Sequence, residues 1–301
     1  MAPEVHGHTM TALITPFDER GRVDLGAAAD LASRLADRGS DGFVVAGTTG
    51  EAPTLSAREK LDLCLAVRRA VDGRACVWLN SGSYSTAESV ELGHAAAQAG
   101  AQGLMAVVPY YNRPPQAGLV RHFAAIAAGA GTLPVMVYNI PGRSATNLLP
   151  QTLAAIVAEA PQVQACKEAS RDLEQAAEMV RLIPGLHLYS GDDQLTLPIM
   201  AVGGRGVVSV AAHLVPERVA ALVDACVQGQ WALARRLQLD LLPLLRVLFC
   251  TTNPIPVKVA LRLCGFPAGG FRLPLCEPTA AERQQIEAVL GDLGLLGSLG
   301  G

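Results

Sequence analysis

The feature of the sequence that most constrains the fold is an alternation of short apolar runs with longer amphipathic runs, which repeats eight times before residue 228. The short runs are continuous stretches of Val, Ile, Leu and Ala, which are typical of parallel strands covered on both faces. They predict strands at 9–14, 42–46, 75–79, 103–108, 134–138, 163–167, 186–190 and 206–210. The helical periodicity between them predicts helices at 24–38, 56–71, 85–99, 119–128, 149–159, 172–182, 194–202 and 216–227.

Eight strand–helix units in succession favour a closed parallel barrel, and hence an α/β protein of the (β/α)8 or TIM-barrel class. The alternative is an open doubly wound sheet that binds a dinucleotide, but no Gly-x-Gly-x-x-Gly motif follows any predicted strand. After residue 228 the strands stop, and helices are predicted at 230–249, 256–264 and 279–290. We therefore expect a catalytic barrel at 1–228 and an all-α C-terminal appendage at 229–301, whose glycine-rich end from residue 291 should fray.

Composition and charge narrow the classes of partner. The formal net charge is -3 and no block of like charge occurs, so neither nucleic acid nor an anionic membrane surface is favoured. The longest uncharged stretches, 92–112 and 122–142, are interrupted by Gly and Pro and do not predict a membrane helix. The first residues lack the pattern of a signal peptide, and the seven dispersed cysteines contain no Cys-x-x-Cys pair. These features predict a soluble, cytoplasmic protein.

In a barrel of this class the reacting groups lie at the carboxyl ends of the strands and in the loops that follow. At these positions the sequence places Thr48, Thr49, Glu51, Tyr110, Tyr111, Asn112, Arg113, Tyr138, Asn139, Arg143, Lys167, Gly191, Asp192, Val208 and Ser209. Three of the chain's five tyrosines belong to this set, although tyrosines in such a row are more often packing residues than reacting groups. The candidate active site is therefore this end of the barrel.

Lys167 is the first candidate for chemistry, because only three of the chain's 24 basic residues are lysines. Lys60 falls in a charged helical run and is expected at the surface, and Lys258 begins a late helix. Lys167 ends an apolar predicted strand, where burial lowers the pKa of an amine and leaves it free to attack a ketone. The alternative is an ordinary ion pair of Lys167 with Glu168 or Asp172.

The residues around Lys167 suit the formation of an imine. The hydroxyls of Thr48, Tyr111 and Tyr138 are candidates to relay protons while an imine forms and becomes an enamine. Arg143 offers a planar fork for a substrate carboxylate, and a surface ion pair is the alternative for it. Together they predict condensation of a keto acid on Lys167.

Two kinds of site that the sequence lacks limit the substrates and cofactors that the reaction can use. The loop at 211–216, after the last predicted strand, has no glycine-rich cradle for a phosphate, which disfavours a phosphorylated substrate. No group of His, Cys, Asp and Glu has the spacing of a metal site, and the pair His6 and His8 stands alone at the terminus. We therefore expect neither a metal nor a cofactor.

Seven segments of the chain, taken in order, match one known family. They are Gly47-Thr-Thr-Gly-Glu51, Pro109-Tyr-Tyr-Asn-Arg-Pro114, Tyr138-Asn-Ile-Pro-Gly-Arg143, Cys166-Lys-Glu-Ala169, Ser190-Gly-Asp-Asp193, Gly206-Val-Val-Ser-Val210 and Thr252-Asn-Pro-Ile-Pro-Val-Lys258. Through these segments the chain resembles the 4-hydroxy-tetrahydrodipicolinate synthase family, formerly called dihydrodipicolinate synthase, among the pyruvate-dependent class I aldolases. The resemblance covers roughly residues 8–290, and it rests on the order of all seven segments because each alone is weak.

The resemblance implies a lyase of lysine and diaminopimelate biosynthesis that joins pyruvate to L-aspartate 4-semialdehyde. It implies that Lys167 forms the Schiff base and that Tyr138 transfers protons, with Thr48 and Tyr111 in the same relay. In the family, the tyrosine that matches Tyr111 reaches into the site of a neighbouring subunit. We therefore expect self-association, at least as a tight dimer and usually as a tetramer built from two dimers.

The resemblance also implies which residues bind the substrates. Thr49 and Val208 match the pocket for pyruvate, and Arg143 matches the residue that holds the carboxylate of the semialdehyde. Gly191, on the same rim, is also expected to bind substrate. Sister enzymes that act on sialic acid or on keto-deoxy sugar acids generally lack this arginine, so Arg143 favours the synthase. A sister aldolase or lyase for another 2-keto acid, and a non-catalytic barrel that binds a metabolite, remain the alternatives.

The chain departs from the family where many members bind lysine as a feedback inhibitor. Glu88 and Tyr110 match that site, but other residues often found there are replaced by Ala52, Pro53, Ala57, Lys60 and Tyr84. Lys60 adds a positive charge near a cationic ligand, and Tyr84 adds bulk. We therefore expect inhibition by lysine to be weak or absent.

Overall fold

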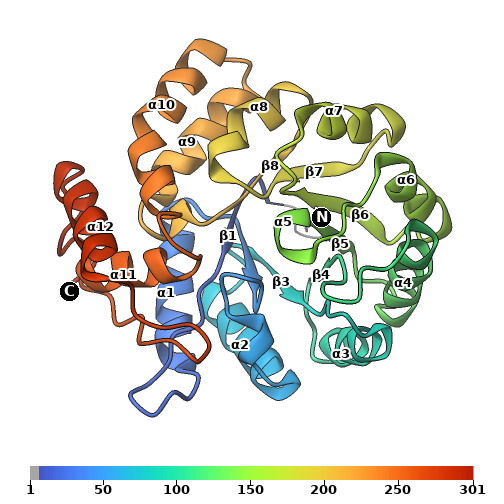
Figure 1. Ribbon diagram of the computed structural model, residues 1–301, viewed down its shortest axis with the longest axis horizontal. Coiled ribbons are helices and arrows are strands. Elements are labelled where there is room, and N and C mark those ends of the chain that lie inside the picture. Colours follow the sequence, from blue (N-terminus) through green and yellow to red (C-terminus); the bar gives the residue numbers. More distant parts are fainter. Residues whose placement is uncertain (1–6, 301) are drawn as a thin grey trace.

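The computed structural model describes residues 7–300 and contains the closed parallel barrel that the sequence predicts (Figure 1). The strands follow one another round the barrel in chain order, and β1 closes it by pairing with β8. They are β1 (Thr9–Ala12), β2 (Gly42–Val45), β3 (Cys76–Asn80), β4 (Gly103–Val107), β5 (Val135–Asn139), β6 (Val163–Glu168), β7 (His187–Ser190) and β8 (Gly206–Ser209). Each lies within two residues of its predicted bounds, so the predicted fold class is confirmed.

A ring of helices covers the outside of the barrel (Figure 1). These helices are α1 (Leu25–Asp37), α2 (Ala57–Val71), α3 (Thr86–Gln98), α4 (Gln116–Gly129), α6 (Pro150–Glu159), α7 (Leu173–Leu182), α8 (Thr196–Ala201) and α9 (Pro216–Val227). The side chain of Ser56 accepts from the backbone N–H of Glu59, and the Glu59 carboxylate accepts from the backbone N–H of Ser56, so this capping box defines the start of α2. Short 3-10 turns follow three strands: η1 (Ala52–Thr54), η2 (Asp193–Leu195) and η3 (Ala211–His213).

One element of the rim differs from the prediction. The loop after β5 contains a four-residue helix, α5 (Pro141–Ser144), where the sequence indicated only a loop. A segment this short shows no hydrophobic periodicity, which explains why it was not predicted. Figure 1 shows α5 at the open end of the barrel, so it places Arg143 there.

The buried residues form an inner and an outer core, because successive side chains of a strand point to opposite faces. The outer core lies between the strands and the covering helices. The inner core fills the barrel and includes Met10, Val44, Trp78, Met105, Met136, Tyr138, Tyr189 and Val208. At Gly103 a side chain would begin only 2.5 Å from the ring of Trp78, so the largest inner residue requires a glycine beside it.

The C-terminal region adds α10 (Trp231–Val247), α11 (Ile255–Leu263) and α12 (Ala280–Asp292). Helix α10 packs against α9, and α11 packs against α12. The sequence predicts fraying from residue 291 onward, and this prediction is wrong for residues 291–300. The backbone N–H of Gly297 donates to the carbonyl of Leu263 at 3.1 Å, and that of Leu299 donates to Cys264 at 2.7 Å. These bonds fasten the glycine-rich end to the last turn of α11.

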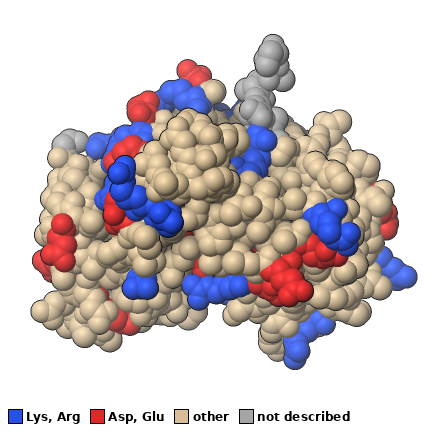
Figure 2. Space-filling view, turned by 90° about the horizontal axis from the view of Figure 1, so that it is seen from above, with Lys and Arg blue, Asp and Glu red and all other residues tan. Residues whose placement is uncertain are grey.

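Some sequence expectations concern residues that the structure does not describe. The N-terminal segment examined for a signal peptide, with His6, lies in residues 1–6, and Gly301 is also outside the described part. Within residues 7–300, no helix is both long and apolar enough to cross a bilayer, and no group of three or more His, Cys, Asp and Glu is placed to hold a metal. Figure 2 shows acidic and basic side chains in small mixed groups over the face it presents.

Candidate active site

Lys167 lies near the carboxyl end of β6, in register with Tyr138 of β5 and Tyr189 of β7. Its side chain is 5% exposed, and its Nζ is 4.3 Å from the centroid of the Tyr138 ring. Burial lowers the pKa of the Lys167 amine to about 8, with the charge of Asp193 opposing this shift and that of Arg143 reinforcing it. The neutral, nucleophilic form of the amine is therefore far more populated near neutral pH than in an exposed lysine.

The alternative ion pair of Lys167 with Glu168 or Asp172 is not what the structure shows. Neighbouring residues of a strand face opposite ways, so Lys167 points into the barrel and Glu168 points out toward the helices. The Glu168 carboxylate accepts from the side chains of Asn139 at 3.0 Å and Gln175 at 3.1 Å. Asp172 caps α7 by accepting from the backbone N–H of Gln175 at 2.9 Å. Both carboxylates therefore have other partners.

Tyr138 and Thr48 meet inside the barrel mouth. Tyr138 is 3% exposed and lines the cavity together with Thr48, which comes from the loop after β2. Burial raises the pKa of the Tyr138 phenol to about 12, although Arg143 and Thr48 oppose this shift. The phenol is therefore protonated near neutral pH and can donate a proton to a group formed on Lys167.

Tyr111 does not join this pair within one chain. It is 92% exposed, and its backbone has a φ of 72°, in the left-handed region. Its neighbour Tyr110 instead lines the cavity and packs edge-on against Tyr84, with ring centroids 5.3 Å apart. The predicted role of Tyr111 therefore requires a second copy of the chain and stays a prediction.

Three of the residues expected to bind substrate lie around Lys167 and the rim. Thr49 is buried, and its Oγ1 accepts from the Nδ2 of Asn253 at 2.9 Å. Val208 is buried in the inner core, on β8. At Gly191 a side chain would begin 2.8 Å from the Cβ of Ala169 and 3.1 Å from the Cγ of Lys167, so only a glycine lets the chain after β7 pass this close to the Lys167 stem.

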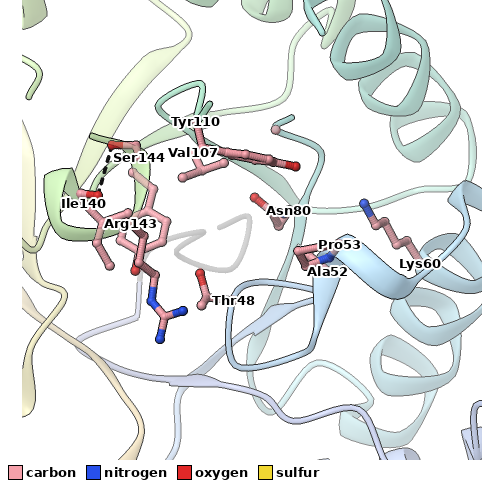
Figure 3. Close-up of a pocket in the computed structure, with 12 residues that line it drawn as sticks. Thr48, Ala52, Pro53, Lys60, Asn80, Val107, Tyr110, Ile140, Arg143 and Ser144 are labelled. Atoms are coloured by element: carbon pink, nitrogen blue, oxygen red, sulfur yellow. Dashed lines mark hydrogen bonds between the residues drawn. The ribbon is translucent and has the colours of Figure 1, made fainter. Parts of the chain in front are cut away.

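Arg143 lies on the mouth of the cavity. Together with Thr48 and Tyr138 it lines a space of about 190 Å³, and Figure 3 shows its guanidinium on the same side of that space as Thr48. Its Nη2 donates to the backbone carbonyl of Asn253 at 3.1 Å. Within the part of the chain that the structure describes, the guanidinium pairs with no carboxylate, so the surface ion pair is absent and the fork remains available to a ligand.

The acidic residue whose charge acts on Lys167 is Asp193, which the sequence analysis did not select. Asp193 is buried, and its Oδ2 accepts from the backbone N–H of Val210 at 2.8 Å. Burial raises the pKa of its carboxyl. Asp192, which was selected, instead forms an ion pair with Arg171 at 2.7 Å. Only its place in the Ser190–Asp193 motif could have pointed to Asp193.

Of the other two lysines, Lys60 differs from its expected position, whereas Lys258 lies in the first turn of a late helix as expected. Lys60, expected at the surface, lines the same cavity as Thr48 and Tyr110, and burial lowers the pKa of its amine (Figure 3). Lys258 is fully buried and lies 2.8 Å from a carboxylate oxygen of Glu51. The available signal for Lys258 was the apolar character of its helix, Ile255–Leu263, on both sides of the lysine.

Comparisons with known proteins agree with this geometry. The model of the dihydrodipicolinate synthetase family matches residues 6–293. The chain is 50% identical over 291 residues to the 4-hydroxy-tetrahydrodipicolinate synthase of Desulforudis audaxviator, covering 96% of this chain and 98% of that protein. The corresponding enzyme of Moorella thermoacetica is also 50% identical, with coverages of 96% and 99%.

Solved structures give the same result. The crystal structure of the Cyanidioschyzon merolae enzyme with lysine bound superposes with a TM-score of 0.95 at 44% identity. The superposition covers 97% of this chain and 100% of that one. Dihydrodipicolinate synthase from Aquifex aeolicus superposes with a TM-score of 0.94 at 37% identity, with coverages of 97% and 99%. The chain therefore belongs to the dihydrodipicolinate synthetase family.

Proposed function

We propose that the chain is a lyase that acts as a 4-hydroxy-tetrahydrodipicolinate synthase, condensing pyruvate with L-aspartate 4-semialdehyde through a Schiff base on Lys167. The enzyme class follows from relatives that are about half identical over nearly the whole chain. The observation that carries the mechanism is the Lys167 amine itself, buried, with its pKa lowered to about 8, and 4.3 Å from the Tyr138 ring. The reaction belongs to lysine and diaminopimelate biosynthesis.

In the first half-reaction the neutral Nζ of Lys167 attacks the ketone carbon of pyruvate. The ketone oxygen leaves as water, and its departure requires a proton that the Tyr138 phenol is placed to supply. The resulting protonated imine then loses a proton from the methyl carbon and becomes an enamine. The Thr48 hydroxyl, which lines the cavity with Tyr138, would give the moving protons a path toward the mouth.

In the second half-reaction the enamine carbon attacks the aldehyde carbon of the semialdehyde. One carbon–carbon bond forms, and the aldehyde oxygen takes up a proton. The amine of the semialdehyde then displaces Lys167 from the former ketone carbon, which closes the nitrogen ring of the product and frees the enzyme. The fork of Arg143 is suited to hold the carboxylate of this second substrate.

Three residues are proposed to bind substrate. Thr49 accepts a bond from Asn253, so its own hydroxyl proton is free to point to the pyruvate carboxylate. Val208 supplies an apolar wall, and Gly191, without a side chain, lets the chain after β7 pass close to the stem of Lys167.

The proposal extends to assembly, organisation and location. The 92% exposure of Tyr111 supports self-association, at least as a dimer and up to a tetramer of two dimers, since its hydroxyl would complete the relay in a neighbouring copy. Residues 1–228 would form the catalytic barrel, with the helices of 229–301 supporting its rim through Asn253 and Lys258. The free cysteines of the described residues are consistent with the reducing cytoplasm.

The two alternatives are less well supported. A sister aldolase would share Lys167 and Tyr138, but it would not need an arginine at the position of Arg143. A non-catalytic barrel would not need a buried amine beside a buried phenol. The names of the relatives also favour the synthase over both.

The experiment combines trapping with turnover. Pyruvate and borohydride should reduce the imine and add a permanent mass to the peptide that contains Lys167, and Lys167→Arg should remove the adduct. Absence of the adduct in the unchanged enzyme would rule out both enzymatic interpretations. A coupled assay with L-aspartate 4-semialdehyde then separates the synthase, which should turn over, from a sister aldolase, which should not.

A further inference from the structure

The reacting pair, Lys167 and Tyr138, is backed by a second pair of polar side chains on the opposite face of the same two strands. Tyr138 is in register with Lys167, and the next pair along the same two strands is Asn139 with Glu168. The first pair faces the inside of the barrel, so the second faces the helices. Asn139 and Glu168 are both buried, at 0% and 3% exposure. A buried polar pair therefore lies directly behind the catalytic one.

Every hydrogen-bond partner of the Glu168 carboxylate is a donor. Its Oε2 accepts from the Nδ2 of Asn139 at 3.0 Å and from the Nε2 of Gln175 at 3.1 Å. Its Oε1 accepts from the backbone N–H of Ser170 at 2.5 Å. An ionised carboxylate offers acceptors only, whereas a glutamine would turn an NH2 group toward these donors. The site is built for a carboxylate.

The partners of Glu168 are themselves held in place. The Nδ2 of Asn147 donates to the Oε1 of Gln175 at 2.7 Å, and the Oδ1 of Asn147 accepts from Asn139 at 2.9 Å. The Oδ1 of Asn139 accepts from the backbone N–H of Leu148 at 3.0 Å. A buried network of this kind rigidifies its surroundings when its members are satisfied. Here it joins the ends of β5 and β6 to α7 and to the segment before α6.

The backbone pairing of β5 with β6 is irregular, which explains why side-chain bonds are needed to hold the ends of these strands in register. The register of β5 against β6 shifts between Val135 and Met136, so the strands begin in one alignment and end in another. A slip by one residue moves every side chain to the other face of a sheet. At the ends of these strands, such a slip would turn Lys167 outward and Glu168 into the barrel. Side-chain bonds beyond the irregularity fix the alignment that the chemistry needs.

We propose that Glu168 is a positioning residue for the reaction, holding the ends of β5 and β6 so that the Lys167 amine stays beside the Tyr138 phenol. This role rests on the proposed function, because it assigns the reacting amine to Lys167. Glu168 faces the helices and not the barrel interior where Lys167 lies. It acts through Asn139 on one strand and through its own backbone on the other.

The role can be separated from simple structural support by the pattern of kinetic changes. Glu168→Gln should lower kcat at least ten-fold and slow the trapping of pyruvate, while KM for the semialdehyde should hardly change because Arg143 is untouched. Burial is the main cause of the raised pKa of Tyr138 and the charge of Glu168 adds to it, so removal of this charge should also move the basic limb of the pH–rate profile slightly to lower pH. A purely structural role would lower Tm and leave kcat and the pH profile unchanged.

A matched control and a second variant keep the test decisive. Ser89→Ala also removes a buried polar group, on α3, and should change Tm without changing kcat or the pH profile. If Glu168→Gln does not fold, Gln175→Met is the variant to measure, because it removes one donor to the Glu168 carboxylate and keeps the carboxylate itself. A fall in kcat with an unchanged KM for the semialdehyde would support the positioning role. If the enzyme without substitutions is active and the folded variant has the same kcat, the inference is overturned. If the enzyme without substitutions forms no adduct with pyruvate, the proposed function is overturned instead.

Discussion

The ammonium of Lys258 lies 2.8 Å from a carboxylate oxygen of Glu51, with both side chains almost fully excluded from solvent, at 0% and 1% exposure. The same ammonium donates to the carbonyls of Thr15 at 3.0 Å and Gly270 at 2.5 Å, so each of its three protons has an acceptor. Glu51 follows Thr48 in the loop after β2. The ion pair therefore ties a loop of the candidate site to helix α11 of the C-terminal region.

Lys258→Met should be strongly destabilising, because it leaves the Glu51 carboxylate buried without its cation. Breaking one side of a buried pair typically costs about 3–5 kcal/mol of unfolding free energy. The double variant Glu51→Gln and Lys258→Met should be more stable than the single one, since no uncompensated charge remains. Denaturant unfolding measures both, and Arg58→Met, in an exposed pair, is the control that should not change stability. A single variant as stable as the unchanged protein would contradict the ion pair.

The rate of imine formation should rise with pH and level off above a midpoint near 8. The amine of Lys167 must lose its proton before it attacks, and burial lowers its pKa from 10.5 to about 8. Initial rates of adduct formation with pyruvate and cyanoborohydride, followed by mass spectrometry, give the midpoint. Asp193→Asn should move the midpoint lower, since the charge of Asp193 favours the ammonium. A rate of adduct formation that still rises steeply at pH 10 would show that the pKa of the Lys167 amine is not lowered.

Arg143→Ala should chiefly damage the use of the semialdehyde. Loss of a charge-assisted bond to its carboxylate should reduce kcat/KM for that substrate by about 10–100-fold, which corresponds to about 1.5–3 kcal/mol. The pyruvate adduct on Lys167 should still form. Arg143→Lys should fall between, because it keeps the charge and loses the fork. If adduct formation failed as well, the assigned role of Arg143 would be wrong.

Tyr111→Phe and Lys167→Ala should each be nearly inactive alone and should regain activity when mixed as subunits. In a mixed assembly, the chain with intact Lys167 can take its missing hydroxyl from the Tyr111 of its neighbour. The 92% exposure of Tyr111 in one chain is the reason to expect this. Co-expression with two different tags, purification of the mixed species and a turnover assay measure it. No recovered activity in a mixed species would place Tyr111 outside the relay.

L-Lysine at micromolar concentration should not inhibit the enzyme. The amine of Lys60 is partly buried in the wall of the cavity, where it repels a cationic ligand, and Tyr84 packs edge-on against Tyr110 in the same region. The initial rate of the coupled assay, titrated with lysine, gives the inhibition constant. Lys60→Gln should leave the uninhibited rate unchanged while allowing lysine to bind more tightly. Low-micromolar inhibition of the unchanged enzyme would falsify this prediction.

The fold was predictable because its signal is repeated. Most residues of the barrel strands are buried, and the covering helices pack apolar side chains against them, so errors at single positions do not change the pattern. Lys167 and Tyr138 were predictable for a related reason. Each ends a predicted strand, and parallel strands end at the same edge, so the fold brings the two side chains together.

The remainder of the site depends on loops whose paths have no periodic signal. Arg143 lies on the four-residue helix α5, and its guanidinium is oriented by a residue 110 positions away, Asn253. The choice of Asp193 over Asp192 depends on a 3-10 turn that begins between them. The sequence places Lys258 at the start of a late helix, but it does not show that the fold brings Glu51 to it from a distant part of the chain. Contacts that are distant in sequence decide all three.

The position of Lys167 on β6 also determines how its occupancy can be measured. Lys167 is the only lysine or arginine between Arg143 and Arg171. Trypsin therefore releases the peptides 144–167 and 168–171 from the free enzyme. Once a reduced substrate is attached to the amine, that cut is blocked and a single peptide, 144–171, remains. The ratio of the long peptide to the short ones would then report the fraction of chains that had reacted.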